Sequence, residues 1–192
     1  MDSNFFAMIF RMKYINRWGL MRNTRSENLS EHSLDVAMIA HALGVIRNKR
    51  FGGDINVDRL AVLGIFHDTN EIITGDLPTP IKYYNDDIKS AYKSLEQSAS
   101  NQILELLPED LRSEWEDVFL PSDDYSEYTA IVKAADKISA LIKCIEEERA
   151  GNTEFMTAKK SQLDAIDSIT LPEVKVFMQE FLPGFYRTLD EN

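Results

Sequence analysis

The sequence contains a single cysteine, eight glycines and six prolines in 192 residues. The lone thiol of Cys144 excludes an internal disulfide and a cysteine-based zinc cluster, and is typical of a small buried residue in a reducing cytoplasm. The first residues include aromatic and basic side chains but lack an apolar run long enough for a signal peptide or a membrane span. We therefore expect a cytoplasmic protein that is not exported and does not enter a membrane.

Positive charge is also scarce, because 21 lysine and arginine residues stand against 32 aspartate and glutamate residues, a formal net charge of −11. Nucleic-acid affinity depends mainly on basic side chains that neutralise phosphates. The charge balance therefore argues against a polynucleotide partner, although one or two well-placed cations can still hold a mononucleotide. Hydrophobic residues make up 44% of the chain, which is usual for a globular protein with a sizeable core.

Apolar residues recur every three or four positions, which is the period of an amphipathic helix, and no strand alternation, repeat or low-complexity linker interrupts them. Asn28 and Glu31 fit a capping box at the start of the first long helix. The sequence predicts helices over residues 31–47, 58–71, 88–106 and 127–149, and a last helix from Pro172 toward Tyr186. The heptad-like stripe of the fourth helix is interpreted as intramolecular core rather than as a coiled coil. We expect an all-α fold, a single compact helical domain over residues 1–192.

An imidazole and a carboxylate, His67 and Asp68, directly follow the apolar run 60–66. An ionised carboxylate is costly to bury unless it is paired or binds a metal, so this pair requires a partner. Glu71 lies one helical turn beyond His67 and covers the same surface of the predicted helix. Asp136 borders the buried stripe of its own helix and also requires a cation there.

The other two histidines, His32 and His41, lie nine positions apart on one predicted helix. At about 100° per residue they face opposite sides, so we interpret His32 as inward-facing and His41 as a structural bystander. With His67, Asp68 and Asp136, His32 offers two imidazoles and two carboxylates. This donor set suits one divalent ion (Co, Mn, Zn, Mg or Fe) and leaves positions open for water and substrate. On spacing alone, a metal site and a purely structural role both stay open.

The order His32, then His67 and Asp68, then Asp136 resembles the HD-domain superfamily of metal-dependent phosphohydrolases. Further stretches resemble the bacterial HD-domain 5′-deoxynucleotidases, the YfbR-like family, along nearly the whole chain. These stretches are FF at 5–6, INRW at 15–18, LMRN at 20–23, SEHSL at 30–34, FGG at 51–53, TGDLPTPIKY at 74–83 and AGN at 150–152. The resemblance implies a cytoplasmic homodimer that uses a divalent metal ion to hydrolyse 2′-deoxyribonucleoside 5′-monophosphates to deoxyribonucleoside and phosphate.

The resemblance also implies roles for individual residues. The family's metal ligands are matched by His32, His67, Asp68 and Asp136. Arg17 matches an arginine that orients the phosphate for catalysis, and its planar fork suits phosphate in a way that lysine does not reproduce. Trp18 matches a tryptophan that crowds the place of a ribose 2′-hydroxyl, which is a steric basis for sugar discrimination. The family's substrate-binding loop is matched by Asp76, Leu77, Pro78 and Thr79.

Two acids are candidates for proton transfer. Glu71 matches an acidic residue implicated in catalysis and is suited to orient or deprotonate the attacking water. Asp76 is suited to protonate the leaving 5′-oxygen or to hold the sugar, and the reverse assignment stays open. Ser139, which follows the last expected ligand, is expected to touch none of these residues.

Two other functions stay open. Another HD-domain phosphohydrolase, acting on nucleoside triphosphates or cyclic nucleotides, would need more cations at its pocket, for which the candidates are Arg17, Arg22, Arg25 and Lys82. A non-catalytic helical ligand-sensing dimer would keep only a vestigial metal site. Such a degraded site should have lost a ligand or its acidic helper, whereas all of them are present here.

Overall fold

The computed structural model describes residues 2–82 and 84–191, without the side chains at positions 79 and 123. Within this part every regular element is helical, and the single isolated β-bridge joins Asn16 to Asn28, so the predicted all-α fold is confirmed. The α-helices are α1 (Phe5–Ile9), α2 (Leu29–Phe51), α3 (Val57–Phe66), α4 (Glu71–Thr74), α5 (Thr79–Lys82), α6 (Asp86–Leu104), α7 (Glu109–Phe119), α8 (Ser126–Arg149), α9 (Met156–Asp167) and α10 (Pro172–Glu180). The organisation as a single domain stays a prediction.

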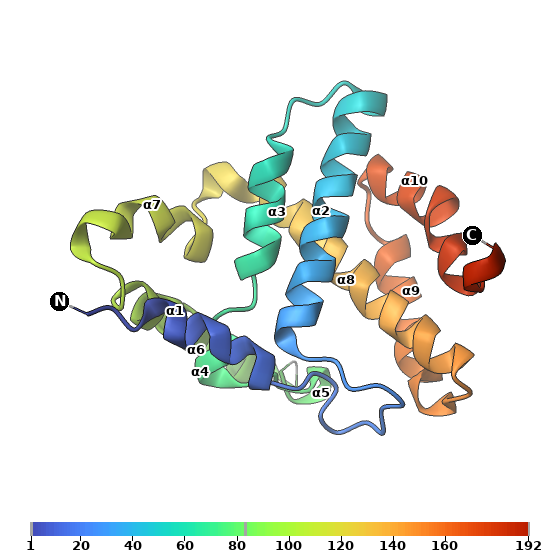
Figure 1. The fold of residues 1–192 in the computed structure, drawn as a ribbon, viewed down its shortest axis with the longest axis horizontal. Helices are drawn as coiled ribbons and strands as arrows, with labels where there is room; N and C mark the ends of the chain where they lie inside the picture. The colour runs from blue at the N-terminus through green and yellow to red at the C-terminus, as the bar shows by residue number, and fades with distance from the viewer. Residues whose placement is uncertain (1, 83, 192) are drawn as a thin grey trace.

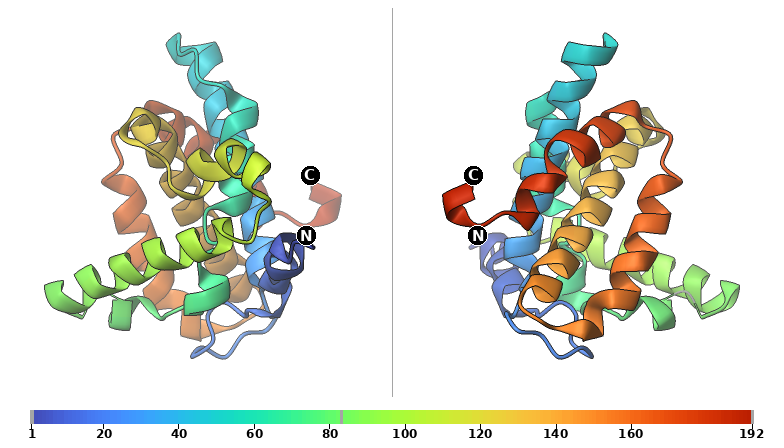
Figure 2. Two further views of the ribbon diagram at one scale, coloured as in Figure 1. Left: turned by 90° about the vertical axis from the view of Figure 1, so that its left-hand side faces the viewer. Right: turned by 90° about the vertical axis from the view of Figure 1, so that its right-hand side faces the viewer.

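The two longest helices, α2 and α8, cross at the centre of the molecule, and α3 packs along α2 (Figure 1). One hydrophobic cluster joins these three helices to α9 and α10, and a second cluster joins α1, α6 and α7. The first turns of α6 extend away from this body (Figure 2). None of the described helices is both long and apolar enough to span a membrane.

Helix α2 begins as the sequence predicts. The Asn28 side chain accepts hydrogen bonds from the N–H groups of Ser30 and Glu31, and the Glu31 carboxylate accepts the N–H of Asn28, so the capping box is confirmed. The helix ends at Phe51, and the residue after it, Gly52, has a φ of +70°, a left-handed conformation that glycine adopts without strain. The capping box at Asn28 fixes the first turn of α2, which carries His32.

Helix α3 is shorter than the predicted 58–71 helix. It ends at Phe66, and a turn over residues 67–70 separates it from α4. Thr69 closes this turn, because its N–H and its hydroxyl both donate to the Phe66 carbonyl, at 3.2 and 2.8 Å. The apolar pattern continues into α4 and therefore concealed the break. His67 and Asp68 consequently lie in a turn at the end of a helix, not inside one.

The later helices follow the pattern more closely. The stripe on α8 is buried from Ile131 to Ile145, which confirms it as intramolecular core. The last helix is shorter than predicted, since α10 ends at Glu180 and a 3-10 turn, Leu182–Tyr186, follows it. Helices α1, α5, α7 and α9 were not predicted, and Cys144 is buried in α8 as expected.

Candidate functional site

Two imidazoles face one another where the end of α3 meets the first turn of α2. His32 is fully buried, and its ring centroid lies 5.3 Å from that of His67. The Nδ1 atom of His67 lies 2.8 Å from the Gly64 carbonyl, and that of His32 lies 3.1 Å from Ser139 Oγ. These contacts occupy each Nδ1 atom and direct each Nε2 atom toward the space between the helices.

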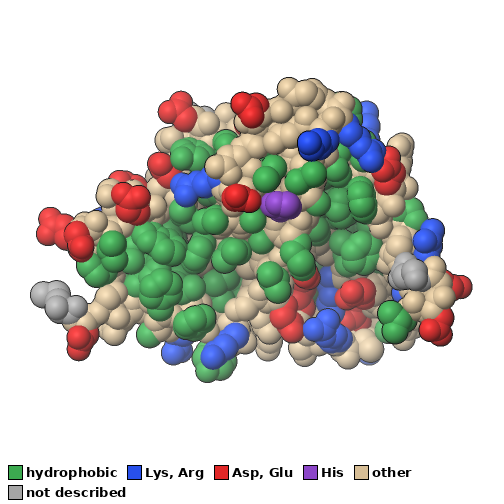
Figure 3. Space-filling model, turned by 45° about the horizontal axis from the view of Figure 1, so that its top comes forward, with side chains coloured by type: hydrophobic (Ala, Val, Ile, Leu, Met, Phe, Trp, Pro, Cys, Tyr) green, Lys and Arg blue, Asp and Glu red, His purple; other side chains and the backbone are tan. Residues whose placement is uncertain are grey.

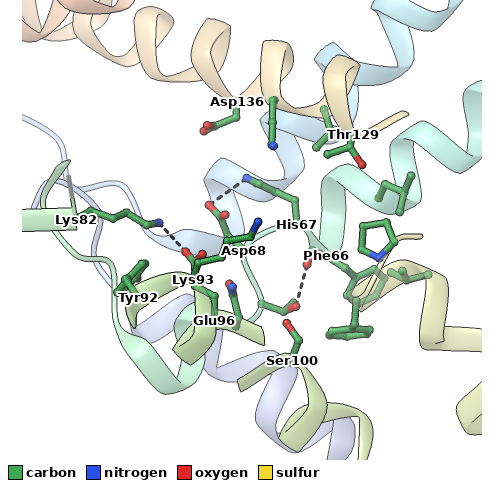
Figure 4. A pocket seen from close by; sticks show the side chains of 18 of the residues that line it. Phe66, His67, Asp68, Lys82, Tyr92, Lys93, Glu96, Ser100, Thr129 and Asp136 are labelled. Atoms are coloured by element: carbon green, nitrogen blue, oxygen red, sulfur yellow. Dashed lines mark hydrogen bonds and ion pairs between the residues drawn. The ribbon is translucent and has the colours of Figure 1, made fainter. Parts of the chain in front are cut away.

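Two carboxylates approach the same space. Asp68 Oδ2 lies 3.0 Å from His67 Nε2 (Figure 4) and 3.7 Å from His32 Nε2. Asp136 Oδ1 lies 3.1 Å from His32 Nε2. Both Nε2 atoms are nevertheless buried without a hydrogen bond of acceptable geometry among the described residues. Ligand atoms of His32, His67 and Asp68 all lie within 4.8 Å of one another, whereas Asp136 lies outside this set and approaches it through His32. Two imidazoles and two carboxylates are also a chemically suitable set for a divalent ion.

The charges of these groups depend strongly on one another. Burial alone would lower the pKa of His67, but the adjacent Asp68 carboxylate raises it to about 9. Burial opposes the ionisation of Asp68, yet His67, His32 and Arg17 hold its pKa well below the usual range. Likewise, the contact with His32 outweighs burial and lowers the pKa of Asp136. Without a metal, the proton on His67 therefore supplies positive charge beside Asp68, in the place where a cation would do so.

Arg17 reaches this cluster from the segment between α1 and α2. Its NH1 group donates to Asp68 Oδ2 at 3.5 Å, and its backbone N–H donates to the Glu27 carbonyl at 2.9 Å. Burial disfavours its charge, but the surrounding carboxylates, Asp136 and Asp68 foremost, raise the pKa of Arg17. The guanidinium is therefore a permanent cation beside the donor cluster, where it can contact a phosphate.

Trp18 and Asp76 lie next to Arg17. The Trp18 backbone N–H donates to Asp76 Oδ2 at 3.3 Å, and its indole N–H donates to Glu27 Oε2 at 2.8 Å. Burial raises the pKa of Asp76, although Arg17 opposes this shift. Leu77 and Pro78 are half-buried in the loop before α5. The side chain of Thr79 lies outside the described residues, so its expected contact with substrate stays a prediction.

Glu71 is buried in the first turn of α4. Burial, together with repulsion from Asp68 and Asp76, raises its pKa to about 9, so it holds a proton at neutral pH in the metal-free protein. Lys82 Nζ lies 3.8 Å from Glu71 Oε1 and 2.9 Å from Glu96 Oε1. The other oxygen of Glu71, Oε2, is buried without a hydrogen-bond partner among the described residues and is free to contact a ligand.

A cavity of about 570 Å³ opens beside the donor cluster, with His67, Asp68 and Asp136 in its wall (Figure 4). Its size is in the range of small-molecule sites. Helices α5, α6 and α8 contribute the cations that line it, namely Lys82, Lys89, Lys93, Lys133 and Lys137. Glu96 is the further acid in this wall, so a protein of net charge −11 presents an excess of positive charge to this cavity.

Two residues of this site, Ser139 and Glu27, were not predicted. Ser139 was expected to touch no functional residue, and this is wrong because its hydroxyl contacts His32. The signal was present, since Ser139 lies one helical turn beyond Asp136 on the same helix. Glu27 contacts Arg17, Trp18 and His32, but only tertiary structure brings these residues together.

The other candidates lie elsewhere. His41 is half-buried further along α2 and does not belong to the donor cluster of the described residues. Arg22 and Arg25 are exposed and pair with Glu154 and Glu31. Like Arg17, Trp18 and Asp76, they are not among the residues that line the cavity.

The sequence and the fold have close counterparts among known proteins. The profile of the YfbR-like 5′-deoxynucleotidases matches residues 4–185. The 5′-deoxynucleotidase of Erwinia tasmaniensis is 49% identical, over 98% of this chain and 96% of its own length. The 5′-deoxynucleotidase YfbR of Escherichia coli is 47% identical, over 99% of this chain and 96% of its own length.

Solved structures share the fold at lower identity. An HD-domain phosphohydrolase from Listeria innocua has a TM-score of 0.83 at 22% identity, covering 95% of this chain and 88% of that one. The cyanophage S-2L HD phosphohydrolase DatZ, bound to dA and one catalytic Zn²⁺ ion, has a TM-score of 0.59 at 23% identity, covering 95% of this chain and 96% of that one. The profile match and the full-length relatives settle the classification: this chain belongs to the YfbR-like 5′-deoxynucleotidase family.

Proposed function

We propose that this protein hydrolyses 2′-deoxyribonucleoside 5′-monophosphates to deoxyribonucleosides and inorganic phosphate. The observation that carries the proposal is the pair of buried, unpartnered Nε2 atoms of His32 and His67, with Asp68 beside them and Arg17 bonded to Asp68. Relatives at 47% and 49% identity along the whole chain are 5′-deoxynucleotidases. The dA and zinc ion bound to DatZ support the same chemistry on the same fold.

In this proposal His32, His67, Asp68 and Asp136 hold one divalent ion. When bound, the ion supplies positive charge that neutralises the phosphoryl oxygens and acidifies a water molecule. Zinc is one candidate, because DatZ contains it, and cobalt, manganese and magnesium are others with suitable ligand chemistry. The Nδ1 contacts with Ser139 and Gly64 would keep both imidazoles oriented.

The remaining residues bind substrate and move protons. Arg17 contacts the phosphate with its planar guanidinium and orients it beside Asp68. Glu71 holds a proton at neutral pH in the metal-free protein, which suits it as a proton donor to the leaving 5′-oxygen. Asp76, whose carboxylate accepts the Trp18 N–H, fixes the substrate-binding loop that continues through Leu77, Pro78 and Thr79.

Trp18 discriminates between sugars in this proposal. Its ring fills the volume that a ribose 2′-hydroxyl would need, and it packs against Phe155 at 5.3 Å between ring centroids. A Trp18→Ala variant should therefore accept ribonucleotides. If Trp18→Ala still refuses ribonucleotides, the steric explanation is wrong.

Phosphate release from matched ribo- and deoxyribonucleoside 5′-monophosphates tests the function. Each pair is assayed with cobalt, manganese, zinc and magnesium and with a chelator control. We expect release from the deoxy series only, with loss of activity on chelation and in His67→Ala. Equal rates on both sugars would contradict the deoxy preference, and activity that survives both chelation and His67→Ala would contradict the metal mechanism.

The same panel includes deoxynucleoside triphosphates and cyclic nucleotides. The five lysines of the cavity wall are the feature that suits a longer phosphate chain. Faster hydrolysis of triphosphates than of monophosphates would assign the protein to that class of phosphohydrolase instead. Metal and nucleotide binding without turnover of any substrate would identify a ligand-sensing module.

A homodimer is the second part of the proposal. Large apolar side chains are exposed on the outer side of α2, at Leu34, Met38 and Val45, and on α1 and after it, at Phe6 and Phe10. On the face shown in Figure 3, hydrophobic side chains gather on the side where α7 lies and across the middle of the face. Exposed apolar area of this kind is typical of protein interfaces. Light scattering should give twice the chain mass for the wild type and a monomer for Met38→Glu; a monomeric wild type would contradict the dimer.

A cytoplasmic location stays a prediction of the sequence.

A further inference from the structure

Glu27, the residue before the N-cap of α2, contacts three functional residues with one carboxylate. Its Oε2 atom accepts the indole N–H of Trp18 at 2.8 Å and lies 3.6 Å from Arg17 Nε. Its Oε1 atom lies 3.7 Å from His32 Nδ1. The side chain is 11% exposed, and its backbone carbonyl accepts the Arg17 N–H at 2.9 Å. Glu27 therefore joins the residues proposed to read the sugar, to orient the phosphate and to bind the metal.

The backbone of Trp18 is held in one conformation. Its φ of +58° is the only left-handed value at a non-glycine residue in the described chain. Residues other than glycine adopt this backbone conformation only when their surroundings impose it. Here the N–H donates to Asp76 at 3.3 Å, and the carbonyl accepts from Met21 N–H at 2.9 Å and from Asn23 Nδ2 at 3.3 Å. These bonds fix the backbone, but the orientation of the indole still depends on contacts at the ring.

The ring has two described contacts that fix it. Phe155 packs against one side of the indole, and Glu27 accepts its N–H at the edge. The Phe155 contact is apolar and tolerates rotation, whereas the hydrogen bond specifies one orientation. A steric filter rejects a hydroxyl only if the filtering group cannot turn away, so the hydrogen bond decides how strict the filter is.

We propose that Glu27 is the positioning residue for sugar selectivity, which it sets by fixing the indole of Trp18 while it aligns Arg17 with the same carboxylate. The inference rests on the proposed deoxynucleotidase function. Glu27 acts through Trp18 and Arg17 and does not itself contact substrate. Its two oxygens divide these tasks, since Oε2 faces Trp18 and Arg17 and Oε1 faces His32.

Two substitutions separate geometry from charge. Glu27→Leu removes the acceptor at similar volume, and Glu27→Gln keeps an acceptor oxygen for the indole but removes the charge that faces Arg17. We expect Glu27→Leu to lower the deoxy-to-ribo ratio of kcat/KM about tenfold, the factor that one hydrogen bond supplies. Glu27→Gln should keep the wild-type ratio and raise KM for both sugar series by the same factor, because both carry the phosphate that Arg17 holds.

The matched control is Glu173→Leu on α10. The carboxylate of Glu173 is fully buried and pairs with an arginine, Arg47, as that of Glu27 pairs with Arg17. Arg47 lies near the other end of α2 from His32. This control should lose stability and keep the sugar ratio. A wild-type ratio in Glu27→Leu, or an equal drop in Glu173→Leu, would overturn the inference.

A double-mutant cycle with Trp18→Phe completes the test, because phenylalanine lacks the indole N–H. Glu27→Leu should change the sugar ratio in the wild-type background and leave it unchanged in Trp18→Phe. If Glu27→Leu does not fold, Trp18→Phe alone must lower the ratio, and an unchanged ratio there overturns the proposal.

A spectroscopic readout is independent of activity. The chain has two tryptophans, so 5-fluorotryptophan labelling gives two ¹⁹F resonances. The Trp18 resonance should shift or broaden in Glu27→Leu and stay near its wild-type position in Glu27→Gln. If the wild type proves inactive on deoxynucleotides, the proposed function fails, while this spectrum still decides whether Glu27 fixes the ring.

Discussion

Gly64 allows α3 to lie directly against the backbone of α2, and a Gly64→Ala substitution should disturb both the packing and the metal site. A methyl group there would lie 2.7 Å from Ala37 Cα and 2.9 Å from Ala37 N. Non-bonded carbon atoms favour separations of about 3.5–4.0 Å, so the two helices must move apart by about 1 Å. Because the obstacle is backbone, no side-chain rotation relieves the contact.

The two expected effects differ in size. Overpacking a core costs about 1–3 kcal/mol. The better helix propensity of alanine offsets up to about 1 kcal/mol, so we expect the free energy of unfolding to fall by about 1 kcal/mol. The effect on metal binding should be larger. The carbonyl of Gly64 contacts His67 Nδ1 at the end of α3, whereas His32 lies on α2, so a shift between the two helices moves the imidazoles apart. Metal–ligand distances vary by only about 0.2 Å, so a shift of about 1 Å should weaken metal binding at least tenfold.

Chelator competition and denaturant unfolding of the metal-free protein measure these effects separately. Gly19→Ala is the stability control, because a methyl group there meets nothing closer than the Asn16 carbonyl at 4.0 Å. A Gly64→Ala variant that binds metal as tightly as the wild type would refute the reasoning that close packing of α2 and α3 sets the distance between the two imidazoles.

Two further predictions concern charge. Because Asp68 raises the pKa of His67 to about 9, metal binding at pH 7 should displace a proton, and the metal Kd should fall about tenfold per pH unit between pH 6 and 8. Calorimetry in buffers of different ionisation enthalpy counts this proton, with Glu71→Gln removing any contribution from Glu71; an enthalpy that does not depend on the buffer would contradict the prediction. The lysines of the cavity wall should attract an anionic substrate, so that Lys93→Glu combined with Lys133→Glu lowers kcat/KM several-fold at low salt and weakens its salt dependence. The exposed Lys175→Glu is the control for net charge, and an equal effect there would show that the cavity lysines have no special role.

The sequence predicted the elements whose apolar pattern and caps are local. The capping box at Asn28 and the buried stripe of α8 were both predictable, because they depend on residues within a few turns of one another. The turn at 67–70 was not, because the apolar pattern continues across it and a side-chain bond from Thr69 ends the helix. That turn nevertheless brings His67 and Asp68 to the donor cluster.

Of the candidate site, only the imidazoles and carboxylates proposed as metal ligands could be predicted from the sequence. Imidazoles and carboxylates at buried positions required partners, and the fold brings His32, His67 and Asp68 within 4.8 Å of one another. The supporting residues could not be predicted in this way. In the sequence, nothing distinguishes Glu27 from other acidic residues that precede a helix. The pairing of Asn16 with Asn28 brings it beside Arg17 and Trp18 in the fold.

Anomalous scattering from crystals grown with manganese or zinc tests the central claim most directly. We expect one peak between α2, α3 and α8, about 2.0–2.2 Å from His32 Nε2, His67 Nε2 and a carboxylate oxygen of Asp68. Asp136 should complete the set from α8. A peak elsewhere, or a fully occupied ion that does not contact His67, would contradict the account.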